Sequence, residues 1–301
     1  MERPPEDTIS AYYPESYYAY HAPARYSLFT RRDALARAWY HVKRSILSSR
    51  FAYRHLGGSI SLGRVASKLP FLERKATFSL DVLLPRFVSG GSLLEVGCGA
   101  GMYLDLMRAL GWSRVAGVDT SAVAAETVQT VLGLEAHCGP LEAIGFPAGA
   151  FDFVAASHTL EHVLDPISFL AEVHRILKGG GTMALVVPNL GSLGFRRYGA
   201  AWYHLDAPRH MSHFTCSSLQ GAVERAGFRV RAIRTSARAA VWTALFSRCI
   251  EEGETQGFWL PGARWRWSQR LRAAAFSMVE HASVACGAPL GEEIHVIAER
   301  R

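Results

Sequence analysis

A glycine-rich turn carries the clearest chemistry in this 301-residue sequence: Glu95-Val96-Gly97-Cys98-Gly99-Ala100-Gly101. Between a strand and a helix, such a turn lets a ligand approach the backbone, and the helix N-terminus favours negative charge. We therefore expect a nucleotide-like cofactor here. A dinucleotide is disfavoured because its fingerprint needs glycine where Met102 stands, and Glu95 would repel a pyrophosphate. An acidic side chain suits a cofactor with a positive charge, such as the amino group of S-adenosylmethionine.

A second acidic residue, Asp119, lies eighteen residues beyond Gly101 at the end of the next predicted strand. A carboxylate at this position is suited to accept hydrogen bonds from both hydroxyls of a ribose. Two alternatives without a ligand stay open at this point. The glycines could form only a tight strand-to-helix turn, and Asp119 could serve as a plain helix cap.

A third group of reactive side chains lies between Trp202 and Phe214, after the fifth predicted strand. If the cofactor is S-adenosylmethionine, the reaction would be methyl transfer from a sulfonium, an in-line displacement in which the protein must align the acceptor and, for a hydroxyl, take its proton. A histidine with a pKa near neutrality suits this task. We predict His210 as the base and His204 as the second choice, with Arg209 or Asp206 orienting the substrate.

A metal site in the same segment is an alternative. Its ligands would be His204, Asp206, His210 and His213. Their spacing matches no specific metal signature, so we predict no metal. Glu161-His162, after the fourth predicted strand, is expected to order its loop rather than to perform chemistry.

Alternating strands and helices position these groups. Short apolar runs predict strands at residues 93–96, 115–118, 134–138, 151–156, 182–187, 228–233 and 294–298. Helical spacing, caps and glycine stops predict helices that begin after Gly101 and end at Gly111, and at 122–132, 167–177 (ended by Gly179-Gly180-Gly181), 215–226, 242–250 and 265–286. Because parallel strands place their carboxyl ends at one edge, the three groups should meet there.

The expected fold class is therefore α/β: a doubly wound, Rossmann-like, seven-stranded mixed sheet with helices on both faces. Three parts of the chain are predicted. Residues 1–90 form an N-terminal arm with basic helices, residues 91–235 form the cofactor-binding core, and residues 236–301 form a helical lid or insertion followed by the last strand.

The middle of the chain resembles the class I S-adenosylmethionine-dependent methyltransferases, in particular bacterial small-molecule and sugar methyltransferases. The resemblance covers about residues 90–235 and rests on ordered motifs: Leu93–Gly101, Gly117-Val118-Asp119, Phe146-Pro147 with Phe151-Asp152-Phe153-Val154, Leu160-Glu161-His162-Val163, Leu177–Gly181, and the P-R-H then F-T pattern at Pro208–Thr215. It implies S-adenosyl-L-methionine as cofactor and a methyl acceptor that is a small molecule or a saccharide.

The resemblance also implies roles for individual residues. The methionine part of the cofactor would lie against the turn residues Glu95, Gly97, Cys98, Gly99 and Gly101, the ribose against Asp119, the adenine edge against the Leu141-Glu142 backbone, and the methyl group beside His158. One departure is Pro140, which stands where many members have an aspartate that binds the adenine amino group. Backbone contacts and packing are therefore expected to hold the adenine.

The formal net charge of +7 is concentrated in residues 25–75, which hold twelve Lys and Arg against two acids. The default interpretation is the solvated side of an amphipathic helix with Leu28, Leu35, Trp39, Val42, Ile46 and Leu47 on its apolar face. If the cations contact phosphates and aromatic residues stack on bases, the segment would bind nucleic acid and the chain would be an RNA methyltransferase. A protein methyltransferase that uses the basic segment is a second alternative, and a peripheral contact of the segment with an anionic membrane is a third. The alternative that is not an enzyme is a cofactor-binding scaffold without catalytic activity.

The five cysteines are widely spaced and form no CxxC pair, so neither a disulfide framework nor a zinc knuckle is indicated. The acidic start of the sequence lacks an apolar run typical of a secretory signal. We therefore expect a cytoplasmic protein in a reducing compartment.

Overall fold

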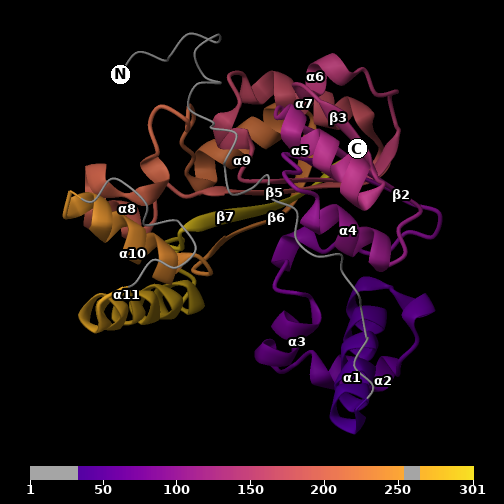
Figure 1. The fold of residues 1–301 in the computed structure, drawn as a ribbon, viewed down its shortest axis with the longest axis horizontal. Coiled ribbons are helices and arrows are strands. Elements are labelled where there is room, and N and C mark those ends of the chain that lie inside the picture. Colours follow the sequence, from indigo (N-terminus) through magenta and orange to yellow (C-terminus); the bar gives the residue numbers. More distant parts are fainter. Residues whose placement is uncertain (1–32, 254–264) are drawn as a thin grey trace.

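The structure is a computed structural model that describes residues 33–253 and 265–301. Seven strands form one mixed sheet in the order β3-β2-β1-β4-β5-β7-β6 (Figure 1). All neighbours pair in parallel except those of β7, which is antiparallel to β5 and β6. The strands are β1 Ser92–Val96, β2 Arg114–Asp119, β3 Glu135–Cys138, β4 Phe151–Ser157, β5 Leu177–Pro188, β6 Phe228–Ser236 and β7 Glu293–Arg300. The predicted seven-stranded mixed sheet is confirmed.

Helices cover both faces of this sheet. Ahead of β1 lie α1 Ala34–Phe51, α2 Ile60–Ala66 and α3 Pro70–Ala76; among the strands lie α4 Met102–Ala109, α5 Ala122–Thr127, α6 Leu141–Ile144, α7 Pro166–Ile176, α8 Leu193–Tyr198, α9 Cys216–Arg225, α10 Ala240–Glu251 and α11 Trp267–Ala285. One apolar core includes side chains of α7 and α9, and a second includes side chains of α4 and α5. Burial on both faces explains why the parallel strands are almost continuously apolar.

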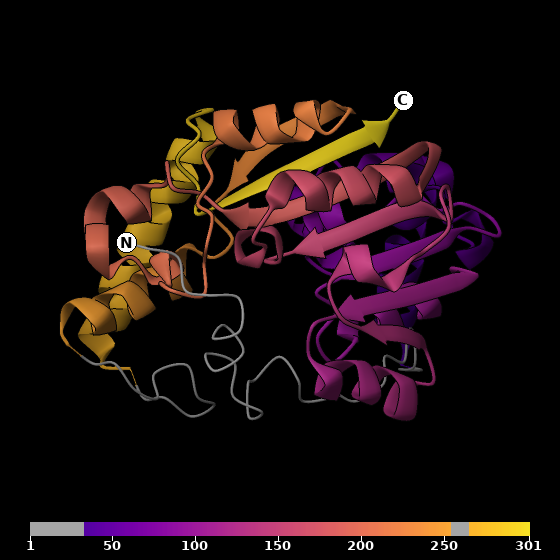
Figure 2. The ribbon, with the colours of Figure 1, turned by 90° about the horizontal axis from the view of Figure 1, so that it is seen from above.

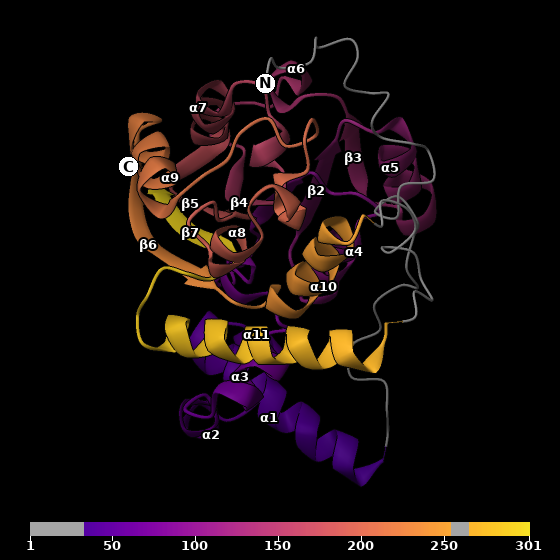
Figure 3. The ribbon, with the colours of Figure 1, turned by 90° about the vertical axis from the view of Figure 1, so that its left-hand side faces the viewer.

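The N-terminal helices α1 to α3 gather at one end of the molecule (Figures 1 and 3). Helix α1 begins after Asp33, whose side chain accepts a hydrogen bond from the Ala36 N–H at 2.9 Å. Its last turns are anchored, because Ile46 and Leu47 are fully buried and Leu47 packs in the core that contains α4. Leu35 is 86% exposed, so the apolar face predicted for this helix is limited to its later turns.

Helices α8, α10 and α11 lie beyond the end to which the parallel strands of the core point (Figure 2). Helices α10 and α11 pack on each other through Ala244, Leu245 and Ala273. They therefore border the edge at which the glycine turn and the histidine-rich segment lie. In the part of the chain that the structure describes, no helix is both long and apolar enough to cross a membrane.

Two predicted elements differ locally from the structure. Helix α7 ends at Ile176, and Gly179 to Gly181 lie inside β5, where the pairing with β4 shifts register. The helix predicted at 122–132 is α-helical only to Thr127 and continues as a π-helical turn at Val128–Leu132. The first 32 residues of the predicted N-terminal arm, Leu28 among them, lie outside the described residues.

Candidate active site

The glycine turn follows β1 directly, and all three of its glycines have positive φ. Gly97 and Gly101 adopt φ values of 76° and 79°, which disfavour any residue with a Cβ atom. A Cβ atom on Gly97 would lie 2.2 Å from the Thr159 hydroxyl oxygen, and one on Gly101 would lie 2.7 Å from a methyl group of Val128. The Gly97 N–H donates to the Val118 carbonyl at 2.8 Å. Glycine is thus required at both positions by conformation and by space.

Glu95 places a carboxylate under this turn. Its Oε2 atom is buried and accepts no hydrogen bond within the described chain. Burial, and secondarily the charge of Asp119, raise the pKa of Glu95 well above its ordinary value. A buried acceptor without a partner is costly unless a ligand donates to it. The amino group of S-adenosylmethionine is such a donor, so the residues present fit this cofactor.

Asp119 ends β2 beside the turn, as predicted. Its Oδ2 atom accepts the Gly99 N–H at 2.8 Å and its Oδ1 atom accepts the Ser121 N–H at 2.9 Å. Desolvation nevertheless raises the pKa of Asp119 above its ordinary value. Each carboxylate oxygen has a second lone pair, which leaves acceptor capacity for the two hydroxyls of a ribose. The backbone contacts fix the orientation of the carboxylate.

The segment predicted to contact the adenine follows β3, the strand next to β2 in the sheet. Gly139 donates its N–H to the Asp119 carbonyl oxygen at 2.9 Å, and Pro140 precedes the first turn of α6. The Leu141 side chain is buried in the core, whereas Glu142 is exposed. A contact of this segment with the adenine therefore falls to the backbone.

Cys98 is placed differently from the other turn residues. Its side chain is 6% exposed and packs in the core with Leu104. Burial raises the pKa of its thiol. Any contact between Cys98 and a cofactor would therefore run through the backbone.

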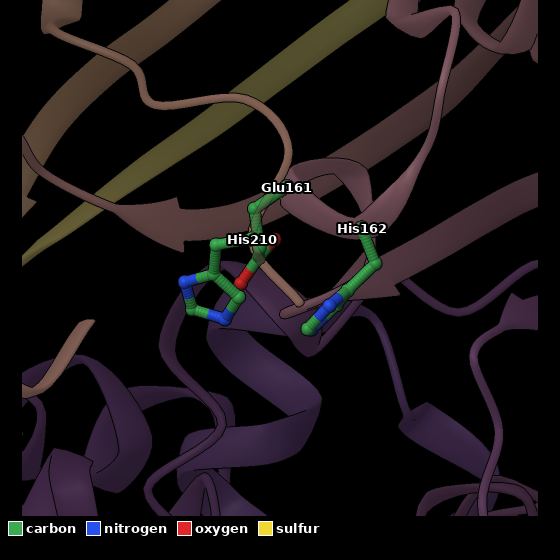
Figure 4. Close-up of side chains that lie close together, drawn as sticks. All are labelled: Glu161, His162 and His210. Atoms are coloured by element: carbon green, nitrogen blue, oxygen red, sulfur yellow. The ribbon is translucent and has the colours of Figure 1, made fainter. Parts of the chain in front are cut away.

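The histidine-rich segment meets the end of β4 in the tertiary structure. The N–H groups of Met211 and Ser212 donate to the Glu161 carbonyl oxygen at 2.8 and 3.1 Å. As a result, Glu161, His162 and His210 converge, with one nitrogen or oxygen atom of each within 4.8 Å of the others (Figure 4). We refer to these three residues as the acid–base cluster.

His210 is held in a defined tautomer. Its Nδ1–H donates to the His204 carbonyl oxygen at 2.8 Å, so Nε2 carries the lone pair. Its side chain is only 8% exposed, and Nε2 lies 3.8 Å from Asp206 Oδ2. Desolvation lowers the pKa of His210 to about 4, against the opposing influence of Glu161. The ring is therefore neutral near pH 7, and its pKa lies below the near-neutral value expected for the predicted base.

Glu161 contributes a buried carboxylate to the acid–base cluster. The residue is 1% exposed, and neither carboxylate oxygen accepts a hydrogen bond in the described chain, although Oε1 forms an ion-pair contact with His158 Nδ1 at 3.3 Å. Burial opposes its ionisation, but the contact with His158 prevails and lowers the pKa of Glu161 to about 2. A fixed negative charge thus lies beside His210. The sequence had suggested only a structural part for Glu161.

His204, the second predicted base, is buried and makes a structural contact instead. Its Nε2 atom lies 3.0 Å from the Thr243 hydroxyl of α10. Desolvation, with the charges of His158 and His210, lowers its pKa to about 3. His204 thus links the 3-10 turn at Tyr203–Leu205 to helix α10.

The other members of the segment have local partners. Asp206 and Arg209 form an ion pair at 2.7 Å, and the His213 Nε2 atom lies 3.1 Å from the Leu205 carbonyl oxygen. Of the four residues considered for a metal, the acid–base cluster contains only His210. The four residues of the metal alternative are therefore not brought together as one group of possible ligands in the described part of the chain.

His158 follows β4 with a left-handed backbone, φ 52°. Its ring lies between two buried carboxylates, 3.3 Å from Glu161 and 3.4 Å from Glu293. Burial disfavours its charge, but these two contacts prevail and raise the pKa of His158 to about 10. It also stacks on His204 at 6.1 Å between ring centroids. His158 is thus an imidazolium at neutral pH.

Sequence reasoning missed Glu293, His295 and Thr243 as neighbours of the site. The sequence shows Glu293 only at the start of a short strand near the C-terminus, and nothing in its spacing links it to His158. The available signal was an acidic residue, Glu293, beside an apolar strand that is expected to be buried. Such a residue is rarely buried without a partner, so a partner for Glu293 could have been sought.

The order of the strands, and a glycine turn with an unpartnered buried Glu95 oxygen, are those of a class I S-adenosylmethionine-dependent methyltransferase. The family model described as a methyltransferase domain matches residues 70–233, more than half of the chain. The chain belongs to this family and is an S-adenosylmethionine-dependent methyltransferase.

Named relatives and solved structures agree with this assignment. The ubiquinone biosynthesis O-methyltransferase of Parvibaculum lavamentivorans is 26% identical over 55% of this chain and 70% of its own length. The enzyme of the same name from Brucella anthropi is 28% identical over 54% of this chain and 71% of its own length. An S-adenosylmethionine-dependent methyltransferase structure from Mesorhizobium loti superposes with a TM-score of 0.50, at 18% identity, over 74% of this chain and 96% of that one.

Proposed function

We propose that the enzyme transfers the methyl group of S-adenosylmethionine to a hydroxyl of a small molecule or saccharide, with His210 as the base. The observation that carries the proposal is the neutral His210 tautomer, which leaves a lone pair on Nε2, in a cluster where one ring nitrogen of His210 lies within 4.8 Å of a carboxylate oxygen of the buried Glu161. The relatives support a hydroxyl acceptor, because their names describe O-methyltransferases acting in ubiquinone biosynthesis.

The proton movement follows from these contacts. When bound, S-adenosylmethionine would supply a methyl group on a sulfonium, and the bond from the methyl carbon to sulfur would break as the acceptor oxygen attacks in line, leaving a neutral thioether. His210 Nε2 takes the hydroxyl proton as the oxygen attacks. Its Nδ1–H stays on the His204 carbonyl, so the ring becomes an imidazolium without turning. The Glu161 carboxylate stabilises the positive charge that appears on His210.

Contacts within the N-terminal helices favour a small acceptor over a nucleic acid. Lys43 lies 3.3 Å from the centroid of the Phe78 ring, and burial lowers the pKa of Lys43 to about 8. Arg50 contacts Glu73 at 3.3 Å. These cations already have partners inside the protein, which supports the amphipathic-helix interpretation of the basic segment.

The test is methyl transfer from labelled S-adenosylmethionine to a panel of catechols, phenols, sugars and RNA. Wild-type enzyme should methylate a small hydroxyl compound and ignore RNA. His210→Ala should lower kcat by about 10²- to 10³-fold, the usual contribution of a general base, while the cofactor Kd from calorimetry changes less than twofold.

The matched control is His213→Ala on the same loop, which should keep most of the activity. Transfer should also survive treatment with EDTA. If His210→Ala retains wild-type turnover, or if transfer requires a divalent cation, the assignment of His210 as the base is wrong. Methylation of RNA alone would overturn the choice of acceptor.

A further inference from the structure

A line of charged side chains leads away from the acceptor site, on the opposite side of His158 from the acid–base cluster. It begins at His158, continues through Glu293 and His295 on β7, and ends at Asp81 in the 3-10 turn Asp81–Leu83 of the N-terminal part. The residues come from segments more than 200 positions apart in the sequence, since Asp81 and His295 are separated by 214 positions.

Each contact along the line is short. His158 Nε2 lies 3.4 Å from Glu293 Oε1, and His295 Nε2 lies 2.9 Å from Glu293 Oε2. On the other side of its ring, His295 Nδ1 lies 3.1 Å from Asp81 Oδ2. Both nitrogens of His295 are therefore directed at carboxylate oxygens. Basic and acidic side chains alternate along the line, and this alternation offsets part of the desolvation cost of burying charges.

The middle of the line is inaccessible to solvent. His295 is 0% exposed and Glu293 is 3% exposed. Arg238, which follows β6, adds a contact with Glu293 at 3.5 Å. The Asp81 end is partly exposed and pairs with Arg234 of β6. Buried charges in an otherwise apolar sheet are more costly than apolar residues of the same size, so packing alone does not account for them.

We propose that Glu293 positions His158 for methyl transfer, and that His295 and Asp81 hold Glu293 in place, so that the N-terminal helical part is coupled to the active site. The inference rests on the proposed function in one respect: it takes His158 to border the methyl group. Glu293, His295 and Asp81 are positioning residues, because they act through His158.

The first test replaces Glu293 with Gln, which keeps the shape and removes the charge. The pKa of His158, followed by histidine-selective NMR, should move down toward the ordinary value. The kcat should fall about tenfold, as expected for a lost orienting contact, with the cofactor Kd changed less than twofold. Glu293→Asp keeps the charge but shortens the side chain. It should largely keep the raised pKa of His158 and still lose turnover.

The matched control is Glu299→Gln on the same strand, which removes a partly exposed partner of Arg231. It should leave both the His158 resonance and kcat unchanged. His295→Gln tests the remote half of the line and should lower kcat with Glu293 intact. Thermal unfolding of each variant shows that it is folded.

An unchanged pKa of His158 in Glu293→Gln would overturn the contact on which the proposal stands. Wild-type kcat in His295→Gln would overturn the coupling to the N-terminal part. The NMR measurement needs no acceptor, so a failure to find methyl transfer would contradict the proposed function and leave the link between Glu293 and His158 separately testable.

Discussion

The glycine turn and the acid–base cluster lie at the same edge of the sheet but are assembled in different ways. The turn comes from one continuous stretch, Glu95 to Gly101, whose shape depends mainly on backbone conformation. The cluster joins Glu161 and His162 after β4 to His210, nearly fifty positions later. On the proposed assignment, backbone geometry would therefore govern cofactor binding, whereas side-chain electrostatics across distant segments would govern the acceptor side.

The largest expected effect is on the turn. Gly97→Ala should destabilise the fold by about 2 to 5 kcal/mol and abolish measurable cofactor binding, because the left-handed conformation and the contact with Thr159 each carry a cost. Gly133→Ala is the matched control. Gly133 has φ 66° and no atom within 4 Å of an added Cβ, so only the conformational cost of about 1 to 2 kcal/mol is expected. Urea unfolding and calorimetry provide the comparison, and equal losses in the two variants would contradict the close-packing argument.

On the acceptor side, Glu161→Gln should reduce kcat by about 100-fold while leaving cofactor affinity nearly unchanged. The substitution removes the charge that stabilises protonated His210 and one of the two carboxylates at His158. Steady-state kinetics and cofactor titration measure the two quantities. A variant that loses cofactor affinity and turnover together would show that the two regions are not separable.

The pH dependence of stability should report on the charge of His158 beside the acid–base cluster. The folded-state pKa of His158, about 10, lies above that of an unfolded histidine. Its contribution to the free energy of unfolding is therefore complete below about pH 6.5 and is lost as the pH rises through 10. Urea unfolding between pH 7 and pH 10 should show stability falling, and the fall should be smaller in His158→Gln. An identical decline in that variant would assign it to other groups.

The smallest expected effect concerns Cys98. Cys98→Ala should lower stability by about 1 kcal/mol through lost packing and leave the cofactor Kd within twofold of wild type. Thermal unfolding and calorimetry test this. A marked loss of cofactor affinity would mean that the Cys98 side chain, and not only its backbone, shapes the turn.

Local patterns predicted much of the fold because their causes are local. The alternation of short apolar strands with capped helices indicated the seven strands, and Thr215 begins α9 through its predicted cap. The pattern was less reliable at Gly179 to Gly181, where glycines typical of a helix stop instead lie inside β5. The three glycines lie where the register between β4 and β5 shifts, between the pairs Phe151–Leu177 and Phe153–Thr182.

By itself, the sequence was enough to predict a cofactor site from Glu95, the three glycines and Asp119, because these residues are close along the chain or end neighbouring parallel strands, so topology brings them together. Only the tertiary structure decided the charge states on the acceptor side. His158 is an imidazolium because two carboxylates face its ring, and His204 is neutral because its ring is buried beside the charged His158. Those carboxylates arrive from β7 and from the end of β4, and a pKa depends on such through-space neighbours rather than on residue type.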